Sequence, residues 1–401
     1  MKNKILFVLT RPPYPAVDGT RERILGELKA LAADFSVDLL IVSDEKITAP
    51  TLDHLRQITG AAIFYFKLPQ LSRYARSLVG IFSPRPLQSA YFFCPAALKW
   101  LKKNNANYRA IHFHTLRFGR YIERLKAVTD RSARLLLCFN DAISLNYRDA
   151  SQKAHGFWRL IYSLETKRVK NYELRLLGLA DGFSIVSERD RDYILSNWTA
   201  KFPNRPAPAI TVIRGALDDS FFNYHYAPKT NNLVFIGNLY YPPNRQGLSF
   251  FCERIWPLIH TQKPDTKLLI IGRGGEIFQS RPNIEVLGFV DDPYALMTEQ
   301  ALFISPADFG AGVPTKTLLA MALGLPVVST ATNAIGIEGV KDQENICLID
   351  YKNPAAAAET IVKTLDDEAY RYQIGQAGQA LVAKYYKQSA NYPKLKAFLN
   401  A

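Results

Sequence analysis

The sequence predicts an α/β protein built from two doubly wound, Rossmann-like domains that face each other across a cleft. Apolar runs of strand length alternate with helix-like segments along both halves of the chain. Many of these runs, such as residues 267–271, are apolar throughout, as expected for parallel strands covered on both faces. A Pro-rich polar stretch at residues 196–209 separates the halves, and 401 residues are too many for one ordinary core.

The Pro-rich stretch sets the predicted domain boundary. We expect a first domain over residues 1–205 and a second over residues 206–385. The last segment, about residues 386–401, is expected to form a helix that packs back on the first domain. Ligands of paired α/β domains usually bind at the carboxyl ends of parallel strands, so we expect a site in the cleft and closure of the halves on binding.

The first half begins as strand, helix and strand. Residues 5–9 and 36–42 are apolar runs of strand length. The helix expected at 21–32 places its apolar residues on one face, at the spacing of a core-packed helix. Further strands are expected at 108–114, 135–139 and 182–186, and further helices at 49–58 and 157–179.

Two of these strand ends carry polar side chains. By strand alternation His112 and His114 share one face, and His114 is the better site candidate because it lies nearer the carboxyl end. Asp141 follows the strand at 135–139. Both candidates have structural alternatives, since the histidine can be an ordinary core residue and Asp141 can cap a helix.

The second half repeats the alternation of strand and helix. A helix is expected at 246–260, and the end of the chain, residues 355–400, is mostly helical. Strands are expected at 209–213, 232–236, 267–271, 284–286, 301–305 and 326–329.

A turn of small residues precedes one helix of the second half. It contains Phe309, Gly310, Ala311 and Gly312, and the helix follows through Lys316. Such a turn lets a phosphate approach free backbone N–H groups, and the positive end of the helix favours negative charge. A tight turn before an ordinary core helix has the same appearance, so the neighbouring motifs must decide between the two.

The composition excludes several classes of protein. Hydrophobic residues at 48% and charged residues at 21% fit a folded globular chain, and no apolar run reaches the ~18 residues of a membrane span. The four cysteines are scattered and show no spacing typical of a metal site or a disulfide framework. We therefore expect no metal and a cytoplasmic location.

The charge is concentrated in the first half. Residues 1–210 carry roughly +15, while the remainder is nearly neutral, which favours an anionic partner for the first half. Within it, residues 62–98 interleave aromatic with basic side chains. This pattern suits peripheral contact with an anionic membrane surface, although the aromatics could equally belong to the core. No nucleic-acid-binding module is recognisable.

Four motifs of the second half occur in order: FIGNLYYPPN at 235–244, LLIIGRGG at 268–275, IEVLGFVDD at 284–292 and FGAGVPTKTLLAMALGLPVVST at 309–330. Together they resemble the donor-binding half of retaining glycosyltransferases of the GT-B fold, the group-four family (glycosyl transferases group 1). The first half resembles that family more weakly, in RPPYPAVDGT, HFH and VSERD.

The resemblance implies specific site residues. His114 matches a histidine beside the reacting sugar, Phe289 and Val290 match contacts to the base, and the small-residue turn would bind the pyrophosphate. The full set of implied donor-binding positions is Gly19, Gly237, Asn238, Arg245, Gly272, Arg273, Phe289, Val290, Gly310, Ala311, Gly312, Thr315, Lys316 and Leu319. His114 and Asp141 are the catalytic candidates.

This chain departs from the family pattern at several of those positions. Ala311 and Leu319 stand where the family usually has two glutamates, and leucine cannot accept hydrogen bonds from a donor's hydroxyls. Asn238 replaces a frequent arginine. The usual lysine of the same loop is absent, although Arg245 lies close in sequence.

The predicted function is metal-independent, hexosyl-type transfer of a sugar from a nucleotide-sugar co-substrate. The first domain would bind a glycan or lipid-linked acceptor, in surface polysaccharide synthesis and with retention of configuration. No other cofactor is expected. Two alternatives remain: a catalytically weakened homologue that acts as a scaffold subunit, and a nucleotide-sugar epimerase.

Overall fold

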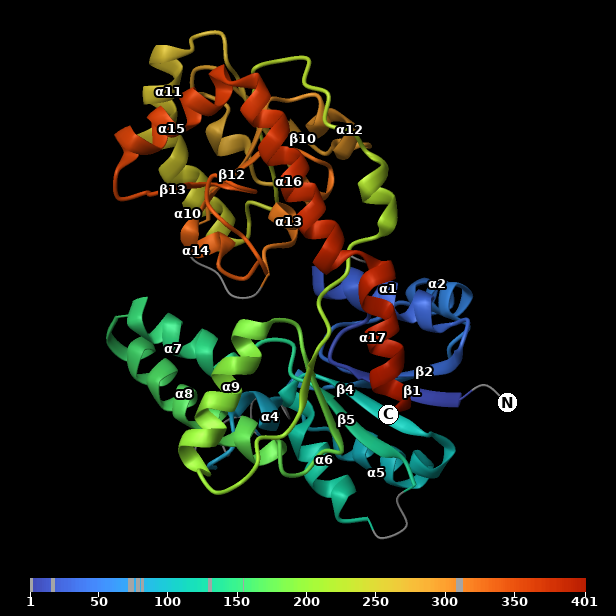
Figure 1. Cartoon of the computed structure of the whole chain (residues 1–401). Coiled ribbons are helices and arrows are strands. Elements are labelled where there is room, and N and C mark those ends of the chain that lie inside the picture. The colour runs from blue at the N-terminus through green and yellow to red at the C-terminus, as the bar shows by residue number, and fades with distance from the viewer. Residues whose placement is uncertain are drawn as a thin grey trace. The chain divides into compact units, whose positions relative to one another are not determined.

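The computed structural model describes residues 3–15, 19–70, 76, 80, 83–128, 132–153, 155–307 and 313–401. They form two compact units (Figure 1). Unit 1 comprises Met1–Ala216 with Asn391–Ala401, and unit 2 comprises Leu217–Ala390. Each unit is described by itself below.

Unit 1 is built on a parallel sheet of seven strands in the order β3-β2-β1-β4-β5-β6-β7. The order reverses between β1 and β4, where open α/β sheets usually bind ligands. In chain order the strands are β1 Asn3–Leu9, β2 Phe35–Ser43, β3 Ile63–Lys67, β4 Ala110–His114, β5 Arg134–Cys138, β6 Gly182–Ile185 and β7 Ile210–Val212.

Helices cover this sheet because its central strands are apolar on both faces and must be buried on both. They are α1 Gly19–Leu31, α2 Ala49–Thr59, α4 Leu87–Tyr91, α5 Pro95–Asn104, α6 Gly119–Lys126, α7 Ile143–Lys153, α8 Gly156–Leu176, α9 Glu188–Lys201 and α17 Gln388–Asn400. The last of these buries Leu395, Phe398 and Leu399 in the core beside β1 and β2.

Unit 2 is built on a second parallel sheet, with six strands in the order β10-β9-β8-β11-β12-β13. Here the order reverses between β8 and β11. In chain order the strands are β8 Leu233–Ile236, β9 Leu268–Ile271, β10 Ile284–Gly288, β11 Leu302–Ser305, β12 Val327–Thr330 and β13 Cys347–Ile349.

The helices of unit 2 enclose two apolar clusters, one on each face of the sheet. They are α10 Pro242–Phe250, α11 Trp256–Gln262, α12 Pro293–Thr298, α13 Thr315–Ala322, α14 Ala331–Ala334, α15 Pro354–Asp366 and α16 Glu368–Tyr386, with a π-helical turn at Phe251–Ile255. The predicted α/β class with two parallel sheets is confirmed.

The predicted domain boundary was wrong. The run expected to open the second half, 209–213, contains β7, which pairs with β6 in the sheet of unit 1. The Pro-rich stretch is therefore a connection within unit 1, and the contact boundary falls at 216/217 instead of 205/206. Residues 63–67, part of the stretch with interleaved aromatic and basic side chains, form the edge strand β3, paired with β2.

The two units differ strongly in charge. Unit 1 carries a formal +18 and unit 2 carries −4, which together give the net +14 of the chain. An excess of this size raises the local concentration of anions around unit 1.

Candidate functional site

The carboxyl ends of β8, β9 and β10 form one continuous surface. The N–H of Gly272 donates to the Gly288 carbonyl (2.7 Å), and the N–H of Leu239 donates to the Arg273 carbonyl (2.9 Å). Gly272 has a φ of 122°, and a Cβ there would lie 2.1 Å from the Gly237 carbonyl oxygen. Since only glycine fits such a position, the close approach of these two loops explains Gly272.

Lys316 brings a cation to the same strand ends. A Cβ on Gly237 would lie 2.7 Å from its Nζ atom, and Nζ lies 6.0 Å from the centre of the Phe235 ring. Burial lowers the pKa of Lys316 to about 8. Among the residues that the structure describes, no carboxylate pairs with this ammonium. A desolvated cation without a counter-ion is stabilised when an anion binds beside it.

The start of α13 adds to this positive character. No side chain caps the helix at Pro314, and its first turn contains no acidic residue. The first N–H groups of a helix lack partners within the helix, and its dipole is positive at this end. The start of α13 and the Lys316 ammonium therefore form a candidate anion site. This site lies close to the point where the strand order reverses, between β8 and β11.

A buried polar network holds the chain on both sides of this site. Nδ2 of Asn333 lies 2.8 Å from Ser305 Oγ and 3.1 Å from Thr317 Oγ1. Those two hydroxyl oxygens lie 2.8 Å apart, and the Thr330 hydroxyl donates to the Ala307 carbonyl (2.5 Å). The network ties β11 to α13 and so fixes the position of Lys316. Sequence reasoning missed it, because isolated Ser, Thr and Asn residues carry no recognisable spacing.

Other predicted donor-site residues lie around these strand ends. Asn238 is exposed, and its Oδ1 accepts a hydrogen bond from the Tyr240 N–H (3.0 Å), which shapes the turn after β8. Arg245, in α10, and Arg273, after β9, are exposed cations. Phe289, directly after β10, is 80% exposed, as a side chain available to a ligand must be.

Leu319 lies one helical turn after Lys316, on the same side of α13. Its half-buried side chain stands where the family resemblance implies a glutamate. A carboxylate there would supply Lys316 with a counter-ion, so leucine leaves the ammonium unpaired. Thr315 opens α13, and Val290 packs against the core of unit 2. Gly310, Ala311 and Gly312 lie outside the described residues.

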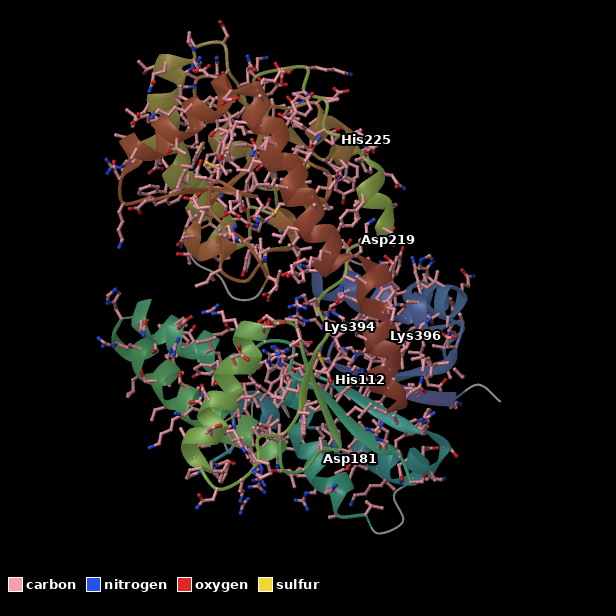
Figure 2. All side chains as sticks on the ribbon, viewed as in Figure 1. His112, Asp181, Asp219, His225, Lys394 and Lys396 are labelled. Atoms are coloured by element: carbon pink, nitrogen blue, oxygen red, sulfur yellow. The ribbon has the colours of Figure 1, made fainter. Side chains whose placement is uncertain are left out.

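Unit 1 contains a buried ionic cluster at the carboxyl end of β4. His114 Nε2 lies 3.9 Å from Glu27 Oε2, and Glu27 Oε1 lies 3.7 Å from Arg23 Nη1. Arg23 Nη2 donates to Asn140 Oδ1 (2.6 Å), which joins α1 to the loop after β5. His112, labelled in Figure 2, lies beside His114 with ring centres 4.4 Å apart. Unlike Lys316, Arg23 has its counter-ion within the fold.

Burial controls the protonation of this cluster. It lowers the pKa of His112 to about 3 and that of His114 well below its usual value, so both imidazoles are neutral at pH 7. It also raises the pKa of Glu27, against the pull of Arg23. Among the described residues the ring nitrogens of both histidines lack hydrogen-bond partners. Gly19, a predicted donor contact, is the first residue of the helix that carries Arg23.

Asp141 lies just past β5. Burial and the neighbouring Asp190 raise its pKa to about 6, and Arg23 opposes this shift. The capping alternative finds no support, because the start of α7 is bound by Glu173 instead: the Ser144 N–H and hydroxyl both donate to that carboxylate (3.1 and 2.5 Å). Asp141 is therefore a partly buried carboxylate that is ionised above about pH 6.

Sequence reasoning missed the Arg23–Glu27 pair. The two residues flank Ile24 and Leu28, which were assigned to the apolar face of the helix at 21–32. A pair of opposite charges at i and i+4 beside an apolar stripe was the available signal. It is weak, since most such pairs are solvated.

The described aromatic side chains of residues 62–98 do not form the exposed surface that a membrane contact through them would require. The Tyr91 hydroxyl donates to Asp44 Oδ2 (2.8 Å), and the Arg117 guanidinium lies 4.9 Å from the centre of the Phe92 ring. Six described aromatics of this stretch are buried or half-buried: Phe64, Tyr65, Phe66, Tyr91, Phe92 and Phe93. These six favour the core interpretation. Tyr74 and Phe82 lie outside the described residues.

No described helix combines the length and the apolar character needed to cross a membrane. In the same part of the chain no group of three or more His, Cys, Asp or Glu side chains could hold a metal ion.

The chain is similar to several known proteins. Residues 230–367 match the model of the family Glycosyl transferases group 1. The chain is 25% identical over 375 residues to an uncharacterized 44.6 kDa protein in the cps region of Klebsiella pneumoniae, and this alignment covers 90% of each chain. It is 28% identical over 120 residues to the capsular polysaccharide biosynthesis glycosyltransferase CapM of Staphylococcus aureus, which covers 30% of this chain and 31% of that one.

Among solved structures, the chain is similar to Alr3699/HepE of Anabaena in complex with UDP. The TM-score is 0.68, the identity 14%, and the match covers 100% of both chains. At this identity the likeness establishes the fold, which is that of the GT-B glycosyltransferases.

Proposed function

We propose that this chain, a protein of the GT-B fold whose residues 230–367 belong to the family Glycosyl transferases group 1, transfers a sugar from a nucleotide-sugar donor held by unit 2. The observation that carries the proposal is Lys316, a desolvated cation without a described acidic partner, beside an uncapped helix start and glycine-lined strand ends. A nucleoside diphosphate supplies the negative charge that this arrangement lacks.

The same groups assist departure of the nucleotide. As the bond between the anomeric carbon and the diphosphate oxygen breaks, negative charge grows on that oxygen. Lys316 and the N–H groups of α13 are positioned in advance and can stabilise it without a metal ion. We accordingly propose metal-independent transfer of a hexosyl-type group, with turnover retained in the presence of EDTA.

The acceptor is proposed to bind unit 1 and to be a glycan or a lipid-linked glycan. The formal charge of +18 on that unit supports an acceptor with anionic groups, and the relative in the cps region points to surface polysaccharide synthesis. The reaction would take place in the cytoplasm, at the inner face of the membrane.

Transfer is proposed to proceed on one face of the sugar, with retention. The acceptor oxygen bonds to the anomeric carbon on the side from which the diphosphate leaves, and the departing phosphate oxygen takes the acceptor proton. No dedicated base is then needed. His114, neutral at pH 7, would contact the sugar or acceptor through hydrogen bonds, and Asp141 would orient the acceptor hydroxyl.

A thermal-shift and calorimetric screen against UDP, GDP, CMP and their sugars tests donor binding. A nucleotide at 100 times its dissociation constant should stabilise the protein by about 2.7 kcal/mol. Lys316→Ala should lower the affinity for that nucleotide by roughly 10–100-fold, as expected for the loss of a charge-assisted hydrogen bond. Lys352→Ala removes an exposed lysine of unit 2 and should leave the affinity unchanged.

A second function, that of a scaffold subunit in a polysaccharide complex, is favoured by one observation. The apolar side chain of Leu319 lies beside Lys316, where a donor hydroxyl would need an acceptor of hydrogen bonds. A scaffold would bind none of the nucleotides and would hydrolyse no donor. An epimerase would instead interconvert nucleotide sugars without any acceptor, which chromatography of the products distinguishes.

A further inference from the structure

Arg117 is a half-buried cation in the short helical turn that follows β4, at the carboxyl edge of the sheet of unit 1. Its Nε donates to Gln88 Oε1 (2.8 Å), and its guanidinium lies 4.9 Å from the centre of the Phe92 ring. Nη1 and Nη2 have no hydrogen-bond or ion-pair partner among the described residues, and the fold does not enclose them. The guanidinium is therefore held through its plane and its Nε, and its forked end is left for a ligand.

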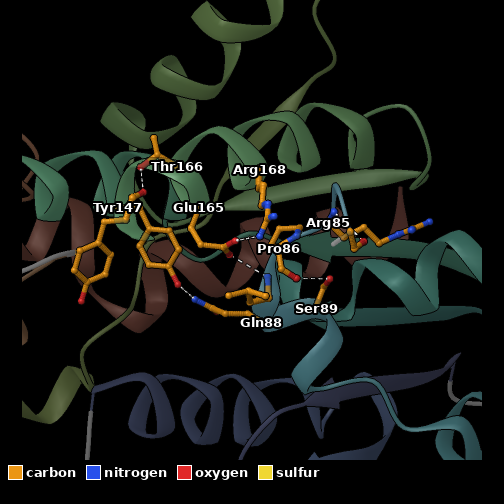
Figure 3. A network of polar contacts seen from close by, with 11 residues as sticks. Arg85, Pro86, Gln88, Ser89, Tyr147, Glu165, Thr166 and Arg168 are labelled. Carbon is orange, nitrogen blue, oxygen red and sulfur yellow. Dashed lines mark hydrogen bonds and ion pairs between the residues drawn. The ribbon is translucent and has the colours of Figure 1, made fainter. Parts of the chain in front are cut away.

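The same amide group holds Tyr147 beside Arg117. Gln88 Nε2 donates to the Tyr147 hydroxyl oxygen, as Figure 3 shows. Because that oxygen accepts the bond, its own hydrogen is left to donate, and no acceptor for it lies among the described residues. Gln88 is itself positioned by α4, where the Leu87 N–H donates to Glu165 Oε2 of α8 (2.9 Å). A forked cation and a hydroxyl donor therefore lie side by side.

Strained backbone connects Arg117 to the strand end that carries His114. Thr115, between them, has a φ of 119°, a value that residues other than glycine rarely adopt. Its N–H donates to the Cys138 carbonyl (2.8 Å), so pairing with β5 keeps the strained residue in place. Such strain costs stability and persists mainly at functional sites. Here it turns the chain out of the sheet just before Arg117.

The charges around Arg117 favour a ligand with a single negative charge. Burial and Arg11, which follows β1, lower the pKa of Arg117, while Asp44, which follows β2, raises it. Arg11 and Arg21 both lie within ion-pair distance of Glu45 (3.5 and 2.7 Å). Three arginines thus meet two carboxylates, which leaves one positive charge at these strand ends. One carboxylate balances that charge, whereas the diphosphate of a lipid-linked glycan would exceed it.

We infer that Arg117 and Tyr147 form a subsite for the carboxylate of an acidic sugar, such as a uronic acid, in the acceptor. The planar fork of Arg117 matches the two carboxylate oxygens, and the Tyr147 hydroxyl can donate to either of them. The strands that lead to Arg11 and Arg117 flank the reversal of strand order in unit 1, where open α/β sheets bind ligands. The inference rests on the proposed function in that unit 1 binds the acceptor, and it adds the charged group that is recognised and the residues that recognise it.

Ligand-observed NMR with the full chain tests the subsite without turnover. The probes are methyl β-D-glucuronide and methyl β-D-galacturonide, with methyl β-D-glucoside as the neutral reference. The wild type should bind at least one uronide about tenfold more tightly than the glucoside, and Arg117→Met should lower the affinity for that uronide by roughly 10–100-fold. The affinity for the glucoside should not change. Arg124→Met, at an exposed arginine of unit 1, is the matched control and should keep the wild-type preference.

Two conservative variants separate binding from folding. Arg117→Lys keeps the charge but loses the fork, so its affinity for the uronide should lie between those of the wild type and Arg117→Met. Tyr147→Phe keeps the ring and removes one hydroxyl, and it should lower the affinity for the uronide by about 3–10-fold. Thermal melting of each variant shows whether it is folded. If Arg117→Met does not fold, the other two variants decide the question.

Three outcomes would overturn the inference: no preference of the wild type for a uronide over the glucoside, an unchanged preference in the folded Arg117 and Tyr147 variants, and tighter Arg117-dependent binding of glucose 6-phosphate, which would indicate a phosphate site. Arg117→Met should retain the nucleotide-induced thermal shift, because Arg117 lies in unit 1 and Lys316 in unit 2. Absence of that shift in the wild type refutes the proposed function, whereas a missing preference for uronides with the shift intact refutes only the carboxylate subsite.

Discussion

The two units bury cations in opposite ways. In unit 1, Arg23 lies 3.7 Å from the carboxylate of Glu27 and donates to Asn140, so its charge is balanced within the fold. In unit 2, Lys316 is desolvated without a described acidic partner, and its pKa falls to about 8. A balanced cation stabilises the structure that surrounds it. An unbalanced one costs stability until a ligand supplies the negative charge.

The strongest test of this contrast removes the cation of unit 1. Arg23→Met leaves Glu27 buried without a counter-ion and Asn140 without its donor, and should cost about 3–5 kcal/mol of unfolding free energy. Calorimetric melting measures the loss. The double variant Arg23→Met, Glu27→Met removes both charges and should recover most of it. A double variant as unstable as the single one would show that packing, and not charge balance, makes Arg23 important.

Much of the fold was predictable because parallel strands buried on both faces are apolar throughout, as in residues 267–271 and 301–305. The errors have physical causes. The edge strand β3 reads IFYFK, whose aromatics suit an interface as well as a sheet. The three-residue β7 follows a Pro-rich stretch that resembles a linker.

Parts of the candidate site were predictable because their glycine and basic residues belong to motifs that follow predicted strands. Gly237, Gly272 and Lys316 were expected from motifs, and the folded unit brings them together at the strand ends, while their contact with a donor stays a prediction. The charge state of a residue was not predictable, because it depends on neighbours distant in sequence. Nothing in the motif around Lys316 indicates that its ammonium lacks an acidic partner, and Glu27 meets His114 only through the packing of α1 on β4.

Glu173 in unit 1 is a buried carboxyl group, and its ionisation should lower the unfolding free energy. Burial raises its pKa to about 7, although Ser144 donates to it. Between pH 4.5 and 7 the folded carboxyl keeps a proton that the unfolded one has lost, so the contribution of Glu173 to the unfolding free energy should fall as pH rises through this window, whereas the buried neutral histidines His112 and His114 contribute in the opposite direction. The fall is about 3 kcal/mol at 1.36 kcal/mol per pKa unit.

Glu173→Gln should remove this contribution, since an amide can bind Ser144 without titrating. Denaturant unfolding at pH 5 and pH 7 gives the comparison. A stability difference between the wild type and Glu173→Gln that is the same at both pH values would contradict the role assigned to Glu173.

Lys316→Met should raise the unfolding free energy, whereas Arg23→Met should lower it. The folded pKa of Lys316 lies below that of the unfolded chain, so the lysine costs stability below about pH 8, and the cost fades as pH rises towards 10.5. Because the side chain is only half-buried, the gain at pH 7 should be about 1–2 kcal/mol rather than the full shift.

The gain from Lys316→Met should vanish at pH 10.5, and nucleotide affinity at pH 7 should fall by roughly 10–100-fold, as in Lys316→Ala. Melting curves with and without UDP measure both effects. A variant that is less stable than the wild type without ligand would mean that Lys316 has a structural partner.

Replacement of Asp141 should change stability least and should instead lower the rate of sugar transfer. If its carboxylate orients the acceptor, kcat/KM of the wild type should fall as pH drops through about 6, where burial and Asp190 place the pKa. Asp141→Asn should lower kcat/KM about tenfold at pH 7.5 and abolish this acidic limb, with the nucleotide-induced thermal shift unchanged. Asp192→Asn, at an exposed aspartate of the same unit, should preserve both. An acidic limb that persists in Asp141→Asn would assign the titration to another group, with Glu27 beside His114 the next candidate, because burial raises its pKa as well.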